Sequence, residues 1–243
     1  MFDINTLINE IVVKDNQIKS SGRNKDRFHV SDAGGCYRAR VYKRLGVEPT
    51  RTIDAPALKK MNAGDASHEK LQQLLRRHGN LVASEGTVET DQLIGHFDAV
   101  VKNGVKTLLE IKTNEKWGMG YIKKQGAKKE HKLQVFTYWS LLRNDYKDLD
   151  DCTLLYMKRE DWEGVAFNFK WTPEIVEQVD GEWQPLIRLW ESKTLPACSC
   201  KELYDGSGPK YCRFGTSDTE CCSELIYENF LKKEEINNQV MVT

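Results

Sequence analysis

Three ionisable side chains stand close together near the middle of this chain of 243 residues. Asp98 falls on one expected β-strand, and Glu110 and Lys112 fall on the next, across the hairpin signal Asn103-Gly104. Carboxylate oxygens are ligands that Mg²⁺ and Mn²⁺ prefer, and such an ion polarises a phosphate and lowers the pKa of bound water. Lys112 can orient or deprotonate that water. The three residues predict a metal-dependent phosphodiester site, although a salt bridge on a solvated hairpin also fits so short a pattern.

The alternation of apolar and polar residues decides which side chains of the hairpin meet. A strict two-residue turn at Asn103-Gly104 would pair Asp98 with Leu109 and place Glu110 on the other face. We therefore expect a β-bulge or a longer loop, which brings Asp98 opposite Glu110. The faces expected in the core carry Phe97, Ala99 and Val101 with Leu109 and Ile111, and the opposite faces carry His96, Asp98 and Val100 with Leu108, Glu110 and Lys112.

The elements around this hairpin follow from periodicity, caps and breakers. Helices are expected over residues 3–19, 33–45, 57–78 and 131–143, and a last helix begins at Thr172-Pro173 and is kinked or split at Pro185. Ser31 and Asp32 are expected to cap the second helix, with Cys36 in its first turn. Strands are expected over residues 81–85, 87–90, 152–158 and 165–170, with a loop or broken helix over 114–129.

These elements predict an α/β (α+β) fold in which helices flank a mixed central sheet. We expect an N-terminal helical region over residues 1–80, a core over 81–195 and a cysteine-rich tail over 196–243. No signal peptide and no apolar run of membrane length are visible, which favours the cytoplasm of a bacterium or of a phage-infected host. Lysines and arginines equal aspartates and glutamates at 36 each, so the chain is not basic over its whole surface.

Four short motifs, taken together, resemble a known family. Gly95-x-x-Asp98 followed by Glu110-Ile111-Lys112 resembles the PD-(D/E)xK nuclease superfamily, with x-x-Asp in place of Pro-Asp. Gly64-Asp-Ala-Ser-His68 and Gln134-Val-Phe-Thr-Tyr138 resemble the Gly-x-x-x-His and Gln-x-x-x-Tyr elements of RecB-family nucleases. Singly, His68 fits a surface histidine and Tyr138 a core aromatic. All four motifs occur in the family order, which is hard to obtain by chance.

The resemblance implies a restriction-endonuclease-like core and a role for each matched residue. Asp98, Glu110, His68 and the backbone carbonyl of Ile111 would bind Mg²⁺ or Mn²⁺, and Lys112 would serve the attacking water. Gln134 and Tyr138 are four residues apart on one helix face and would position DNA or the lysine. A lysine cluster, which alone fits a solvated loop, would then guide phosphates; its members are Lys123, Lys124, Lys128, Lys129 and Lys132.

Cysteines gather at the end of the chain. Five of the seven lie within the last fifty residues, which in a reducing cytosol suggests metal or iron–sulfur ligation more than disulfides. Cys152 falls in an apolar strand and is expected to be a buried structural thiol. The other six are Cys36, Cys198, Cys200, Cys212, Cys221 and Cys222.

The segment from Ser31 to Gly46, which contains Cys36, resembles RecB-family members that carry an iron–sulfur cluster. These include the CRISPR-associated adaptation nucleases, the AddB-type subunits and the Dna-two-type helicase–nucleases. The resemblance implies that one early and three late cysteines hold a [4Fe–4S] cluster, but the late spacing departs from the usual pattern and leaves Cys₄ zinc as the rival. The preferred ligands are Cys36, Cys200, Cys212 and Cys221, with Cys198 and Cys222 as alternates.

Together these observations predict a metal-dependent deoxyribonuclease. We expect an exonuclease acting on DNA ends or single strands in phage or bacterial recombination, replication or repair, with a recombinase or single-strand-binding protein as a possible protein partner. Three alternatives stay open: a catalytically inactive DNA-binding or scaffold module of the same fold, a CRISPR spacer-acquisition nuclease and a restriction-type endonuclease.

Overall fold

The computed structural model describes residues 3–203, 212–215, 222, 224, 227–229 and 231–232. The chain divides into two compact units, neither of which is a single run of sequence. The first unit comprises Met1–Arg23, His29–Gly34 and Ile53–Gln184, and the second comprises Asn24–Phe28, Gly35–Thr52 and Pro185–Thr243.

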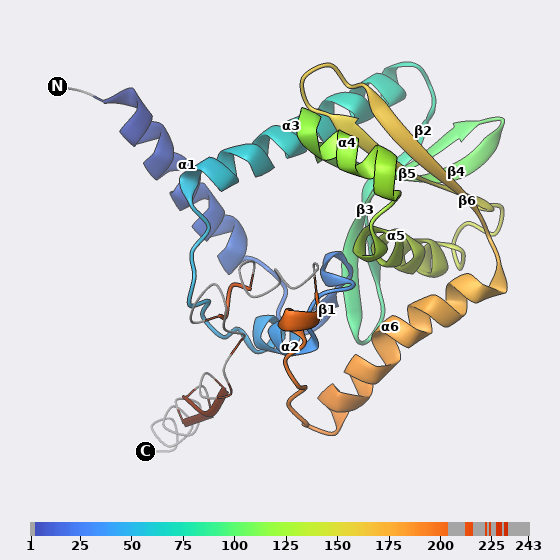
Figure 1. The fold of residues 1–243 in the computed structure, drawn as a ribbon. Helices are drawn as coiled ribbons and strands as arrows, with labels where there is room; N and C mark the ends of the chain where they lie inside the picture. Colours follow the sequence, from blue (N-terminus) through green and yellow to red (C-terminus); the bar gives the residue numbers. More distant parts are fainter. Residues whose placement is uncertain are drawn as a thin grey trace. The chain divides into compact units, whose positions relative to one another are not determined.

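One mixed sheet of six strands forms the centre of the fold (Figure 1). Its path is β1-β3-β4-β5-β6, and β2 also pairs with β3. Strands β4 and β5 are parallel, whereas the β2–β3, β3–β4 and β5–β6 pairs are antiparallel, so the predicted mixed sheet is confirmed. The strands are β1 (Phe28–His29), β2 (Leu81–Glu89), β3 (Leu93–Asn103), β4 (Val105–Asn114), β5 (Asp151–Lys158) and β6 (Gly164–Lys170).

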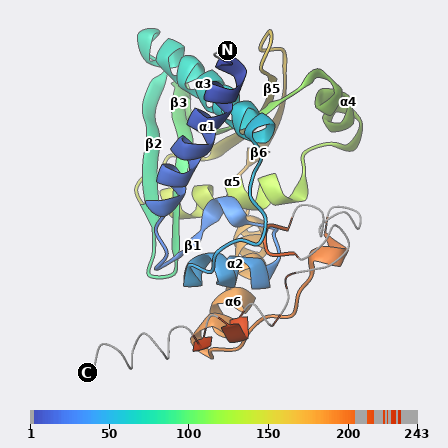
Figure 2. The same cartoon turned by 90° about the vertical axis from the view of Figure 1, so that its left-hand side faces the viewer.

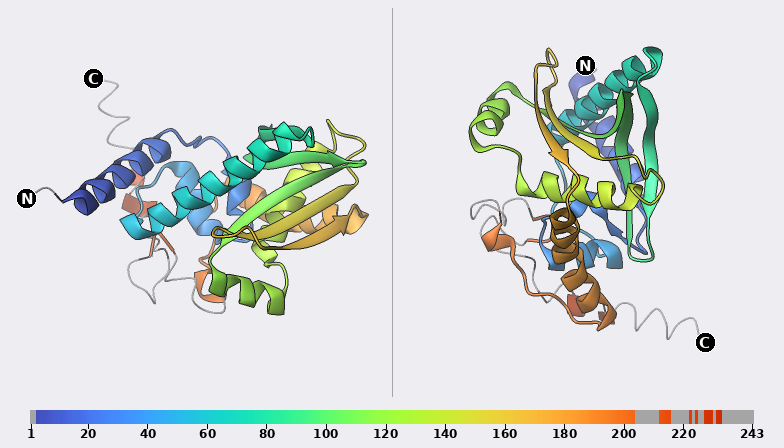
Figure 3. Two further views of the ribbon diagram at one scale, coloured as in Figure 1. Left: turned by 90° about the horizontal axis from the view of Figure 1, so that it is seen from above. Right: turned by 90° about the vertical axis from the view of Figure 1, so that its right-hand side faces the viewer.

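Helices cover both faces of this sheet. In the view from above, α3 and α4 lie on opposite sides of the strands (Figure 3). A parallel pair such as β4 and β5 needs a crossover connection, which α4 and α5 supply. None of the helices in the described part of the chain is long and apolar enough to cross a membrane. The helices are α1 (Ile4–Ser21), η1 (Val30–Asp32), α3 (Ala55–Arg77), α4 (Lys116–Gln125), α5 (Lys129–Leu142) and α6 (Pro173–Glu191).

Buried aromatic side chains fix α5 in the first unit. Trp183 of α6 donates its indole N–H to the hydroxyl of Thr137 at 2.8 Å, and both side chains are buried. Trp139 donates its indole N–H to the carbonyl oxygen of Leu149 at 2.7 Å. Each buried N–H therefore has a partner, and the helix that carries Gln134 is held by directional bonds as well as by packing.

The second unit joins two distant segments of the chain (Figure 2). It contains α2 (Tyr37–Leu45) and the short helix η2 (Cys200–Glu202). Tyr42 of α2 is fully buried against Phe214, with the ring centroids 5.4 Å apart. The hydroxyl of Thr50 donates to the carbonyl oxygen of Gly215 at 2.8 Å. Residues 212–215 are thus packed and hydrogen-bonded onto residues 35–52.

The start of α2 differs from the prediction. The helix begins at Tyr37, so Cys36 is its N-cap residue and does not lie in its first turn. Gly34 adopts a left-handed φ of 73°, which interrupts a helix before Cys36. Asp32 lies in η1 and pairs with Arg23 at 2.8 Å, so its carboxylate is engaged away from α2.

Two further elements also differ from the prediction. Of the kink or split predicted at Pro185, the split is wrong, because helix α6 continues from Pro173 to Glu191 with Pro185 inside it. The carbonyl that loses its partner to this proline belongs to Gly181, an exposed position where water can bond it. The two predicted strands before the hairpin form one strand, β2, whose register shifts between Leu81 and Ala83.

The packing of β2 on β3 predicts a stability difference between two glycine substitutions. A Cβ at Gly86 would lie 2.4 Å from the ring of Phe97, which is buried. Gly86→Ala should therefore lower the free energy of unfolding by about 1–3 kcal/mol. Gly120→Ala is the control, because no described atom lies within 4 Å of the added Cβ, and it should be neutral or stabilising by ~1 kcal/mol. Urea unfolding of both variants checks this, and equal stabilities would contradict it.

Candidate functional site

The hairpin has the register that brings the two carboxylates together. Ala99 pairs with Leu109, and the pairing continues in the same register to Asn103 and Val105, so Gly104 alone lies between the two strands. Gly104 supplies the left-handed φ of 79° that this turn requires. This register places Asp98 opposite Glu110 as predicted, but the predicted bulge or longer loop is wrong, because the shift of register comes from a shorter connection in which Gly104 alone separates the paired residues Asn103 and Val105.

Asp98 follows directly beyond the last recorded pair and is held from three directions. Its Oδ2 accepts the backbone N–H of Ile111 at 2.6 Å, and its Oδ1 lies 3.6 Å from Nδ1 of His68 on α3. Gln72, one turn further along α3, donates its side-chain N–H to the carbonyl oxygen of Asp98 at 2.9 Å. Helix α3 and strand β4 thus fix both the backbone and the carboxylate of Asp98.

Glu110 is the most deeply buried charged side chain of the site, at 1% exposure. Its Oε1 lies 2.8 Å from Nζ of Lys112, whereas its Oε2 has no hydrogen-bond partner among the residues that the structure describes. Burial and the nearby charge of Asp98 raise the pKa of Glu110 to about 7. Val100 and Leu108 of the same face are fully buried, whereas His96 is exposed, so this face is buried around Glu110 and open to solvent at His96.

Helix α5 supplies the other side of the site. Oε1 of Gln134 accepts a hydrogen bond from Nζ of Lys112 at 2.7 Å, and Tyr138 lies one turn further along and is buried. Burial and the charge of Glu110 raise the pKa of the Tyr138 hydroxyl, which therefore stays protonated. His131, one turn before Gln134, has a pKa lowered to about 3 by burial and by Lys112, and is neutral. The four sequence motifs thus meet at one place.

Glu85 is a site residue that the sequence did not point to. It lies on β2 between the pairs Ser84–Ala99 and Gly86–Phe97, which places it opposite Asp98. Its φ of 52° is rare for a residue with a side chain, and such strain gathers at functional sites. Its Oε1 accepts a hydrogen bond from Gln72 at 2.6 Å, so Gln72 links Glu85 to the backbone of Asp98. A single glutamate in an alternating strand carries no sequence signal for this role.

The lysine cluster lies on α4 and at the start of α5. Lys123 is paired at 2.9 Å with Glu163, the residue directly before β6, and Glu163 also pairs with Lys158. The remaining side chains are exposed or half-buried; they are Lys124, Lys128, Lys129 and Lys132. Lys123 is therefore already engaged by a carboxylate, and the structure attaches no comparable partner to the exposed lysines in the part of the chain it describes.

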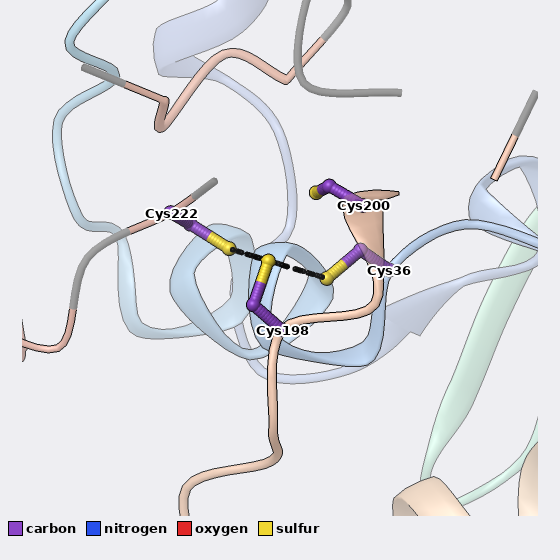
Figure 4. A group of neighbouring side chains, drawn as sticks. All are labelled: Cys36, Cys198, Cys200 and Cys222. Atoms are coloured by element: carbon purple, nitrogen blue, oxygen red, sulfur yellow. Dashed lines mark hydrogen bonds between the residues drawn. The ribbon is translucent and has the colours of Figure 1, made fainter. Parts of the chain in front are cut away.

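A second group of chemically reactive side chains lies in the second unit. The sulfur atoms of four cysteines lie within 4.8 Å of one another, and Figure 4 shows how their side chains converge. The Sγ of Cys222 is 3.3 Å from that of Cys198, and the Sγ of Cys36 is 3.9 Å from Cys198 and 4.0 Å from Cys222. Cys200 completes the set.

Cys212 adjoins this group as a fifth thiol. It is buried, and hydrogen bonds from Cys200 and Cys222 lower its pKa. Cys36 and Cys200 of the preferred ligand set thus lie in the group of four with both alternates, Cys212 adjoins that group, and Cys221 lies outside the described residues. Cys152 is buried in β5 as predicted, and burial raises its pKa well above the ordinary value.

The donor set of the cysteine group fits a thiolate-bound metal. Zinc–sulfur bonds of about 2.3 Å in a tetrahedron separate the sulfur atoms by roughly 3.8 Å, which is close to the sulfur separations among Cys36, Cys198 and Cys222. The four thiols would have to move apart to enclose a [4Fe–4S] cluster, whose cube is larger than a single ion. The sulfur separations therefore fit a single metal ion, and they would have to increase to hold a [4Fe–4S] cluster.

Comparison with known proteins shows a shared fold. No protein-family model and no curated protein matches the sequence. Among solved structures, the chain is similar to SSO0001, at 16% identity and a TM-score of 0.53 over 88% of this chain and 95% of that one. It is also similar to LHK-Exo, an alkaline exonuclease from Laribacter hongkongensis solved with dAMP, at 14% identity and a TM-score of 0.50 over 69% and 89% of the two chains. The predicted fold class, a central mixed sheet flanked by helices, is confirmed.

The raised pKa of Glu110 predicts a pH dependence of stability. Because its pKa rises from an ordinary 4.5 to about 7, the folded metal-free chain binds a proton that the unfolded chain releases, and stability falls as the pH rises through about 7. Glu110→Gln cannot titrate. Between about pH 5 and about pH 8 in EDTA, the free energy of unfolding of the wild type should fall by on the order of 1–3 kcal/mol relative to that of this variant. Urea unfolding at both pH values measures the difference, and parallel pH profiles would contradict the burial of a titrating carboxyl.

Proposed function

We propose that this chain is a divalent-metal-dependent deoxyribonuclease of the PD-(D/E)xK type that acts as an exonuclease on DNA ends or single strands. One observation carries the proposal. Asp98 and Glu110 lie together beside Lys112, and the buried Oε2 of Glu110 has no hydrogen-bond partner among the described residues. A buried carboxylate oxygen without a partner is unfavourable unless a cation or a proton occupies it.

The residues present fit a hard divalent cation. Asp98 and Glu110 would hold Mg²⁺ or Mn²⁺ through oxygen atoms, with His68 and the carbonyl of Ile111 as the further proposed ligands. Such an ion, when bound, polarises the scissile phosphate and favours ionisation of the attacking water. His68 is placed for this by geometry, since its Nδ1 lies 3.6 Å from Oδ1 of Asp98. Burial lowers the pKa of His68, but the hydrogen bond to Asp98 and the charges of Asp98 and Glu110 outweigh burial and raise it, so a bound cation would have to displace a proton from this ring.

Lys112 is the residue proposed to act on the attacking water and on the charge that develops on the phosphate. Its Nζ is fixed between Oε1 of Glu110 and Oε1 of Gln134, at 2.8 and 2.7 Å. Two acceptors hold the amine in one place, which is what positioned catalysis needs. The acceptor Gln134 is itself buried on α5, so it serves to position the lysine.

DNA is the proposed substrate. The structurally similar LHK-Exo is named as an exonuclease and was solved with dAMP, a mononucleotide. In this chain the lysine cluster on α4 and α5 follows the catalytic strand β4 directly and is proposed to bind phosphates, with affinity that falls as salt rises. Recombination, replication or repair in a phage or bacterium is the proposed setting, with a recombinase or single-strand-binding protein as the proposed protein partner. The same site would serve a CRISPR spacer-acquisition nuclease.

The cysteine group is proposed to hold a metal that closes the second unit. A [4Fe–4S] cluster is the first candidate, since the thiolate set suits it. Zinc is the second candidate, favoured by the short sulfur separations. Either would tie residues near Cys36 to residues near Cys200 and Cys222, which are far apart in sequence.

Removal of the catalytic lysine tests the proposed nuclease. Lys112→Ala should slow digestion of end-labelled DNA in Mg²⁺ or Mn²⁺ by roughly 100-fold or more, because a fixed cation at the phosphate is lost. Lys106→Ala is the matched control on the same strand, where the lysine is paired with Asp148 at the protein surface, and it should leave the rate unchanged. EDTA should abolish cleavage by every variant.

The form of the substrate separates the alternatives. An exonuclease should degrade linear single- or double-stranded DNA from its ends and spare closed circles. Fixed fragments from a closed circle would indicate a restriction-type endonuclease. Absence of cleavage on every linear substrate with either metal, by a folded wild type, would leave only the inactive DNA-binding module.

Anaerobic purification tests the cysteine centre. The wild type should retain a stoichiometric metal, brown with visible absorbance for iron–sulfur and colourless for zinc. Cys200→Ser should lose that metal, because it removes a thiolate of the group. Cys152→Ser is the control, since this buried thiol lies on β5, and its metal content should match the wild type. Wild-type protein without bound iron or zinc would contradict the proposed centre.

A further inference from the structure

One buried arginine connects the segments that carry the cysteines. Arg38 lies on α2, two residues after Cys36, and is only 7% exposed. Its Nε donates to the carbonyl oxygen of Pro196 at 2.7 Å, and its Nη1 donates to the carbonyl oxygen of Cys222 at 3.3 Å. Its Nη2 donates to Oε1 of Glu224 at 2.8 Å. All three acceptors belong to the C-terminal segment.

The positions of these acceptors determine what the guanidinium can do. Pro196 precedes Cys198 by two residues, and Cys222 is itself a member of the cysteine group. A single planar group therefore sets the distance between the two stretches of the tail that bring thiols to Cys36. The fixed fork of a guanidinium makes such divergent bonds at once, whereas the single ammonium of lysine does not reproduce its geometry.

The charge of Arg38 has a second consequence. Its recorded carboxylate partner, Glu224, is 68% exposed, so water screens that ion pair. Four thiolates around one zinc ion or an iron–sulfur cluster leave a net negative centre inside the protein, which burial disfavours. The guanidinium bonded to the Cys222 carbonyl places positive charge beside that centre.

We propose that Arg38 is a positioning and charge-compensating residue of the cysteine metal centre. The inference rests on the proposed centre, since it assigns a role toward a metal held by these thiols. Arg38 does not touch the metal: it acts by holding the backbone around Cys198 and Cys222 and by offsetting the charge of the thiolates.

Three full-length variants separate the two contributions. Arg38→Lys keeps the charge and loses the fork, Arg38→Gln loses both, and Glu224→Gln removes only the exposed ion pair. Each protein is loaded in separate experiments with Zn²⁺ and with iron plus sulfide under anaerobic conditions. Elemental analysis gives metal per chain, and the rate of metal loss to EDTA gives retention. The rise in unfolding temperature on loading is measured against the metal-free form of the same variant, so that a merely structural loss cancels.

The expected order of retention follows from these roles. Arg38→Gln should lose metal roughly 10–100-fold faster than the wild type and gain less stability on loading, as is usual when a partner of the ligands is removed. Arg38→Lys should lie between the two, and Glu224→Gln should stay within about 3-fold of the wild type because an exposed ion pair contributes little.

The outcomes also separate this inference from the proposed centre. A wild type that takes up neither Zn²⁺ nor iron contradicts the centre itself, and the role of Arg38 falls with it. A wild type that binds metal while Arg38→Gln retains it equally well, with an equal gain in unfolding temperature, overturns the role of Arg38 alone. Equal losses in Glu224→Gln and Arg38→Gln would assign the effect to the surface ion pair instead and would also overturn it.

Discussion

The first unit depends on a carboxylate that is buried without enough partners. Glu110 is almost fully buried, one of its oxygens is bonded to Lys112, and the other lacks a hydrogen-bond partner in the described chain. Asp98 lies nearby and adds a second negative charge, which raises the pKa of Glu110. A protein interior tolerates such a pair only if a proton or a cation compensates it. The same feature that weakens the metal-free chain therefore supports the proposed cation site.

The surrounding elements serve to keep that pair in place. The tight turn at Gly104 sets the register of β3 and β4, and α3 anchors Asp98 through Gln72 and His68. Helix α5 fixes Lys112 through Gln134. In the second unit the thiols lie in a buried cluster with the apolar residues Tyr42, Val47 and Phe214, and the buried Arg38 bonds to the backbone beside them. A bound metal would supply the cross-link that such a small unit needs.

The sequence predicted the site correctly where the two-residue alternation of a strand and the chemistry of its side chains indicate the same arrangement. Strand alternation requires Asp98 to face Glu110, which rightly excluded a strict two-residue turn, although the turn that provides this register is shorter than predicted. The prediction failed where contacts between residues distant in sequence decide the conformation. Asp32 pairs with Arg23 instead of capping α2, and Glu85 takes a positive φ that an alternating strand pattern does not indicate. Arg38 lies in an ordinary helical pattern, and only folding brings its guanidinium to Pro196 and Cys222.

Calorimetric titration of the metal-free protein with Mn²⁺ tests the central claim most directly. If Mn²⁺ displaces the proton that Glu110 holds near neutrality, binding at about pH 6 must release protons, and the measured enthalpy must change with the ionisation enthalpy of the buffer. At about pH 9 the carboxyl is already ionised, so the buffer dependence should vanish, and Glu110→Gln should abolish high-affinity binding. Mn²⁺ binding without proton release at the lower pH, or no binding at all, would contradict a cation site built on this buried carboxylate.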